Sequence, residues 1–107
     1  MIDPNAHISR RNIAANVDLV TASKTYGNAD NPTQPREIDV TNAGSSTIAI
    51  VLADPSLCVG DIVFLKFNKD SSGGLTVDGL GLTQDTSSSD ATKHIYFASQ
   101  SAWTKIN

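Results

Sequence analysis

β-Branched and short polar residues dominate this chain at the expense of helix formers, and this balance most restricts what it can fold into. Val, Ile and Thr together account for 26 residues, while 12 Ser and 8 Asn supply much of the remaining polarity. Glu37 is the one glutamate, although surface helices usually carry Glu and Lys on their solvated face. Short hydroxyl and amide side chains compete with helical backbone hydrogen bonds and suit strands and turns. The chain is therefore predicted to be all-β.

Seven segments show the alternation or the apolar content of strands. In segment 46–52, Ile48, Ile50 and Leu52 share one face, and smaller residues occupy the other. Segment 62–67 is apolar on both faces, which is typical of a central strand or of a strand at an interface. We expect a small antiparallel β-sandwich or barrel of about seven strands. The predicted strands cover residues 17–22, 38–41, 46–52, 62–67, 75–78, 92–98 and 102–106.

Polar segments rich in turn-forming residues separate these strands. Residues 68–74 contain two adjacent glycines and are predicted to close a hairpin, and residues 99–101 are predicted to close the last one. Gly79 and Gly81 interrupt a strand pattern, which indicates a bulge or a sharp bend. Residues 84–91 are predicted to be a polar loop.

The chain divides into an N-terminal arm and one domain. Residues 1–16 show neither helical nor strand periodicity, so we expect an arm that becomes ordered against a partner, with a frayed terminus as the alternative. Residues 17–107 form a single β domain, which contains a long loop over residues 23–36. A fold of 11.3 kDa buries roughly 65% of its unfolded surface. Its core is thin, and a subunit interface would add to it.

Composition argues against several classes of function. A formal charge of −3 with scattered charged residues is not typical of a nucleic-acid binder. No apolar run approaches the ~18 residues of a membrane span, and no secretory signal opens the chain. Cys58 is the one cysteine, which excludes an internal disulfide and a thiolate zinc site, and we expect it to be a small buried residue.

The sequence contains no recognisable catalytic or metal-binding motif. His7 and His94 accompany no nucleophile motif, and the aspartates lack the spacing of an EF-hand loop. We therefore expect no catalytic residue, no metal and no cofactor. His94 is expected on the outward face of its strand, with Ile95 and Phe97 pointing inward.

Tyr96 and Trp103 admit two roles. Exposed side by side, the two rings could stack on a sugar. Packed together between strands, they would instead close the core, which is the favoured interpretation.

Four motifs follow one another between Thr47 and Asn107: LADP at 52–55, VGDIV at 59–63, GGLTVDG at 73–79 and SAWT at 101–104. This stretch resembles β-rich modules of tailed-phage tail fibres and tailspikes, and small capsid-bound proteins of such phages. The resemblance implies a trimeric module that binds other virion proteins or host glycans, and it transfers no catalytic residue. It does not cover residues 1–35.

Among these virion roles, the arm and the small domain favour a head decoration, or cement, protein that bridges neighbouring capsid subunits. We expect a homotrimer on the major capsid protein at the virion surface, made in the host cytoplasm and without enzymatic activity. The arm residues expected to contact the capsid are Ile2, Ile8, Arg10, Arg11 and Ile13.

Two alternatives come from other classes. The chain could be a receptor- or glycan-binding module of a tail fibre, in which Tyr96 and Trp103 stack on the glycan. It could also be a small enzyme with two carboxylates across a cleft between subunits.

Overall fold

The computed structural model describes residues 17–89 and 93–107, and in these residues it contains nine strands and one short 3₁₀ helix. The predicted all-β class is confirmed. No helix in the described residues is both long and apolar enough to cross a membrane. The elements are β1 (Val17–Val20), β2 (Lys24–Thr25), β3 (Glu37–Asn42), β4 (Ile48–Val51), the 3₁₀ helix η1 (Pro55–Leu57), β5 (Ile62–Lys69), β6 (Leu75–Asp78), β7 (Asp85–Ser87), β8 (Lys93–Ala98) and β9 (Trp103–Lys105).

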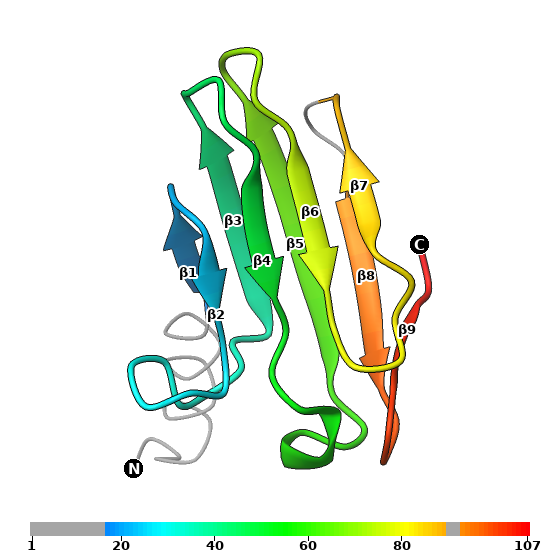
Figure 1. Ribbon diagram of the computed structural model, residues 1–107. Coiled ribbons are helices and arrows are strands. Elements are labelled where there is room, and N and C mark those ends of the chain that lie inside the picture. The colour runs from blue at the N-terminus through cyan, green and yellow to red at the C-terminus, as the bar shows by residue number, and fades with distance from the viewer. Residues whose placement is uncertain (1–16, 90–92) are drawn as a thin grey trace, which may run out of the picture.

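The strands form two mixed sheets, which lie as two layers in Figure 1. One sheet has five strands in the order β1-β3-β5-β8-β9, and the other has four in the order β2-β4-β6-β7. Strands β1, β3 and β5 are parallel, as are β2, β4 and β6, whereas β5–β8, β6–β7 and β8–β9 are antiparallel pairs. The prediction of about seven antiparallel strands is therefore wrong in number, and wrong in direction for four of the seven strand pairs in the described residues.

The parallel pairing arises because the chain changes sheet after every strand from β1 to β5, and so winds as a coil. Glu37 in β3 lies beside Phe64 in β5, and Ile48 in β4 lies beside Leu75 in β6. These two pairs have the same separation in sequence, so one turn of the coil has the same length in both sheets. Positions that face inward in one turn therefore stack on inward positions of the next.

One hydrophobic core lies between the sheets. Alternate residues of each strand point into it, including Ile38 and Val40 of β3 and the predicted trio Ile48, Ile50 and Leu52. The remaining members are Val20, Tyr26, Ala53, Val63, Leu65, Phe67, Leu75, Val77, Tyr96, Ala98 and Trp103.

Two segments predicted as loops contain strands. Residues 23–36 include β2, which pairs with β4, and residues 84–91 include β7, which pairs with β6. Both strands are polar and very short, so no apolar alternation marks them. Residues 68–74 connect strands of different sheets and do not close a hairpin, whereas residues 99–101 join antiparallel β8 and β9 as predicted.

The bend predicted at Gly79 and Gly81 makes room for Trp103. The Trp103 side chain is buried, and its Nε1 donates a hydrogen bond to the carbonyl oxygen of Ala53 at 2.7 Å. A methyl group on Gly79 would lie 2.8 Å from Trp103 Cδ1, and Gly81 adopts a φ of +78°. Glycine is thus required at both positions, first for close packing and then for a left-handed backbone.

Asn42 fastens together the two connections that carry the chain from one sheet to the other. Its Nδ2 donates to the carbonyl oxygens of Ser46 at 2.8 Å and Gly74 at 2.9 Å. Its Oδ1 accepts a hydrogen bond from the amide of Gly44 at 3.0 Å. The Asn42 side chain is buried, so its amide depends on these backbone partners for its hydrogen bonds.

We predict that Asn42→Ala lowers the free energy of unfolding by about 2–3 kcal/mol, because it removes three hydrogen bonds of a buried side chain. Ser45→Ala in the same connection removes an exposed side chain and is the matched control. Urea unfolding followed by circular dichroism measures both. Equal stabilities for the two variants would contradict the role given to Asn42.

Candidate interaction surface

The outward face of the five-stranded sheet carries large apolar side chains between charged ones. These residues alternate with the core residues of the same strands, and so they point away from the other sheet. Leu19 is 75% exposed, Phe64 40% and Phe97 37%. We call this face the outer surface and define it by Val17, Leu19, Glu37, Asp39, Ile62, Phe64, Lys66, Ile95 and Phe97.

Strand register arranges the outer surface in rows that cross the sheet. One row consists of Val17, Glu37, Phe64 and Ile95. Ile62 lies beside Phe97 in the row that precedes it along β5. Asp39 lies beside Lys66 in the row that follows. The apolar side chains of β5 and β8 thus lie at the end of the face where β5 begins, whereas Leu19 of β1 lies in the row of Asp39 and Lys66.

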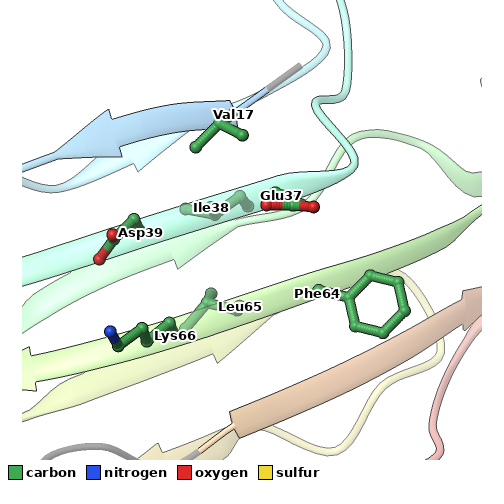
Figure 2. A pocket seen from close by; sticks show the side chains of 7 residues that line it. All are labelled: Val17, Glu37, Ile38, Asp39, Phe64, Leu65 and Lys66. Atoms are coloured by element: carbon green, nitrogen blue, oxygen red, sulfur yellow. The ribbon is translucent and has the colours of Figure 1, made fainter. Parts of the chain in front are cut away.

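A shallow groove crosses β1, β3 and β5 on this face. Figure 2 shows side chains from all three strands along it, with the Phe64 ring at one end of the β5 segment and Lys66 at the other. The groove is lined by Val17, Glu37, Ile38, Asp39, Phe64, Leu65 and Lys66. At one end Val17 and Phe64 lie on either side of Glu37, and at the other end lie Asp39 and Lys66.

The opposite, four-stranded sheet presents a different face. Its outward positions include Ala49 and Val51 in β4, Thr76 in β6 and Thr86 in β7, all of them small or polar. Apolar side chains scattered singly on a surface are ordinary, whereas a contiguous apolar patch marks an interaction site. Of the two sheets, the five-stranded one carries such a patch.

Asp85 closes the gap between the sheets on the side of β7 and β8. Its carboxylate accepts hydrogen bonds from His94 Nδ1 at 2.8 Å, from the Tyr96 hydroxyl at 2.7 Å and from Lys105 Nζ at 3.0 Å. The His94 and Asp85 side chains are almost fully buried. His94 Nε2 is buried without a hydrogen-bond partner among the described residues.

Asp18 closes the opposite side, between β1 and β2, in the same manner. Its carboxylate accepts hydrogen bonds from Lys24 Nζ at 2.6 Å and from the Tyr26 hydroxyl at 2.7 Å. Tyr26 belongs to the core. Each open side of the two layers is thus closed by an aspartate that binds a buried tyrosine and a lysine.

Hydrogen bonding dominates the ionisation of both aspartates. Burial alone would raise the pKa of Asp85, but hydrogen bonds from Tyr96, Lys105 and His94 outweigh it, and the pKa lies below the usual value. Burial likewise opposes ionisation of Asp18, while Lys24 and Tyr26 lower its pKa overall. Burial, followed by the hydrogen bond to Asp85, raises the pKa of Tyr96 well above the ordinary tyrosine value.

These clusters have the chemistry of structural supports. Asp85, His94 and Tyr96 include an acid and an imidazole, but none of the hydrogen bonds described links them to a serine or cysteine nucleophile. Within residues 17–89 and 93–107, no group of three His, Cys, Asp or Glu residues is placed to hold a metal ion. Cys58 is partly buried, and burial, followed by Asp61 and Asp54, raises the pKa of its thiol.

The structure corrects the prediction for His94. His94 is buried, whereas Ile95 and Phe97 point outward, so the predicted faces of β8 are exchanged. The reason lies in the neighbours of the strand, because Asp85 binds both His94 and Tyr96, which must therefore share one face. A one-residue change of phase exchanges every side chain between core and solvent.

Tyr96 and Trp103 lie in the core, at 0% and 1% exposure. The interpretation that they close the core is confirmed. The alternative in which the two rings stack on a glycan is wrong, since no ring face is open to a sugar.

The predicted arm contacts, Ile2, Ile8, Arg10, Arg11 and Ile13, lie outside the described residues. The outer surface was not predicted as a site. Its one signal in the sequence was the apolar content of both faces of residues 62–67, which includes Ile62 and Phe64.

Comparisons of the chain with protein families, with curated protein sequences and with solved structures find no match.

We predict that Asp85→Asn destabilises the fold at neutral pH by about 2–4 kcal/mol, because Tyr96, His94 and Lys105 lose a charged acceptor. The folded-state pKa of Asp85 is lowered, so its stabilisation is present above the unfolded value near 4 and is lost as the pH falls through the folded value. The variant should therefore lose less stability than the wild type between pH 5 and pH 3. Thermal unfolding across this range provides the measurement, with Asp70→Asn as an exposed control. Equal acid sensitivity of Asp85→Asn and wild type would refute the linkage.

Proposed function

We propose that this chain is a structural protein of a tailed-phage virion, which decorates the capsid as a homotrimer and bridges neighbouring copies of the major capsid protein. The observation that carries the proposal is the outer surface. A contiguous apolar patch on a well-packed sheet is the property of a protein that works in an assembly. The virion setting comes from the resemblance of residues 47–107.

The layout of the described domain supports a binding role over catalysis. The polar clusters around Asp18 and Asp85 are occupied in closing the fold. Under the proposal, the protein stabilises the capsid by burying its own surface against capsid subunits, and each contact adds to the binding free energy. At about 25 cal/mol per Å², burial of about 300 Å² of apolar area contributes about 7 kcal/mol before the costs of ordering.

In the proposed mechanism, the segment 1–16 contacts the capsid through Ile2, Ile8, Arg10, Arg11 and Ile13. This segment is joined to the domain at Val17, which belongs to the outer surface and to the edge strand β1. Arginine pairs well with carboxylates of a partner, and the isoleucines supply apolar area. Several such segments on one oligomer would bind together far more tightly than one.

The alternative function, a glycan-binding module of a tail fibre, has less support. The residues predicted to stack on the glycan, Tyr96 and Trp103, are in the core. A glycan site would have to use side chains other than the two predicted. We therefore prefer capsid decoration.

We predict that the full chain sediments with capsids of the phage that encodes it, stripped of their decoration, and raises their unfolding temperature. Deletion of residues 1–16 should reduce binding by at least about tenfold, because the arm supplies the capsid contact. Arg10→Ala with Arg11→Ala tests the charged part of that contact. The control is Thr86→Asp, which changes an exposed residue on the opposite sheet and should bind like the wild type.

Absence of binding by the full chain at any tested concentration would refute the proposed function. Undiminished binding by the chain without residues 1–16 would instead refute the arm mechanism.

A further inference from the structure

The outer surface consists of two halves that differ in charge. The half formed by β1 and β3 carries Glu37 and Asp39, and the half formed by β5 and β8 carries Lys66. Both halves also carry apolar residues. On the first half these are Val17 and Leu19, and on the second Ile62, Phe64, Ile95 and Phe97.

Within one copy these charges do not satisfy one another. Asp39 lies beside Lys66 in the strand register, yet no ion pair joins Lys66 or Glu37 to any other residue of the described parts of the chain. Asp39 instead accepts a hydrogen bond from Asn68 Nδ2 at 2.5 Å. The Lys66 side chain is exposed and points away from the core.

The two halves match each other when a second copy faces the first. Rotation about an axis that runs along the strands between β3 and β5 places β5 of one copy over β3 of the other. Asp39 and Lys66 occupy the same level along the strands, so each Asp39 then faces the Lys66 of the neighbour. In the row of Val17, Glu37, Phe64 and Ile95, the same rotation places Val17 opposite Ile95 of the other copy and Glu37 opposite its Phe64.

The same contact of one half on the other can also close a ring of three copies. In a ring, the β1–β3 half of each copy meets the β5–β8 half of the next, and the levels of Asp39 and Lys66 again coincide. The match between Asp39 and Lys66 therefore identifies which halves of the outer surface meet. The mass of the oligomer in solution distinguishes two copies from three.

The size of the face indicates a weak contact. Its five strands contain 27 residues, which at about 3.3 Å per residue and about 4.8 Å between strands give a face of about 430 Å² per copy. Two faces in contact would bury about 860 Å², which is in the range of weak, transient interfaces. Association should therefore depend on concentration within an accessible range.

We propose that the outer surface binds further copies of this chain, with the acidic β1–β3 half of one copy against the Lys66 half of its neighbour. The inference deepens the proposed function and rests on it for the virion setting, but its test needs only the purified chain. The outer surface would then hold several copies together. The segments 1–16 of these copies would bind the capsid at the same time.

Sedimentation velocity of the full chain over a range of concentrations tests the proposal. The wild type should reach two or three times 11.3 kDa, and Phe64→Asp should remain at the mass of one chain. Phe64 is 40% exposed and lies outside the core, so this variant should keep the wild-type circular dichroism spectrum. Thr86→Asp on the other sheet is the matched control and should associate like the wild type.

Exchange of charge tests the pairing itself. Lys66→Glu alone places like charges in contact, and Asp39→Lys alone does the same, so each should weaken self-association by about tenfold or more. An equimolar mixture of the two variants should associate again, since each contact between unlike chains pairs an acid with a lysine. A pair regains both contacts, whereas a ring of three keeps one contact between like chains and should recover only in part. A structural effect of either substitution would not be cured by mixing.

A wild-type chain that stays monomeric at every concentration would overturn the inference, as would an oligomer that Phe64→Asp leaves intact. A monomer that binds capsids through Phe64 would overturn it while leaving the proposed function standing. An oligomer that dissociates in Phe64→Asp but binds no capsid would support the inference and refute the function.

Discussion

The stacking of inward side chains from one turn of the coil onto those of the next is the interaction on which the rest of this structure depends. Ile38 lies beside Leu65, and Val40 beside Phe67, in the five-stranded sheet. In the other sheet, Ile50 lies beside Val77. The step from β3 to β5 and the step from β4 to β6 have equal lengths, so inward residues of this turn bury apolar area against those of the previous turn and against the facing layer. The outward positions are thereby left free to carry other residues, and in the five-stranded sheet these are large and apolar.

The same constraint explains where the polar clusters lie. The two sheets are not joined along their sides, so the core is open at β1 and β2 and at β7 and β8. Water would reach the core at both places if no side chains covered them. At both openings a tyrosine supplies apolar bulk, while its hydroxyl donates to Asp18 or Asp85. A lysine then satisfies the remaining charge. The hydrogen bonds of Asp85 with His94, Tyr96 and Lys105 resemble an acid–base site, but their role is structural. They attach β8 and β9 to β7 and so to the coil.

The sequence allowed prediction of the class and of most strands, because local alternation decides them. Ile38 with Val40, and Ile48 with Ile50, follow that alternation and are buried as expected. The direction of pairing could not be predicted, because it depends on the chain changing sheets, which turn composition does not reveal. The face of β8 was predicted wrongly since Ile95 is more apolar than His94, and the decisive partner, Asp85, lies in a strand too short to recognise. The outer surface could not be predicted for a related reason. Phe64 points outward and Phe67 inward, but the sequence alone does not show which of two apolar faces is buried.

The central claim is that the outer surface is covered by further copies of the chain, and its three phenylalanines allow a direct test. Phe64 and Phe97 belong to the outer surface, whereas Phe67 is fully buried in the core. Fluorine NMR of protein labelled with fluorophenylalanine reports on all three positions at once during dilution. The account predicts that two resonances shift with concentration while that of Phe67 stays in place. Three resonances that remain unchanged from micromolar to millimolar concentration would contradict it.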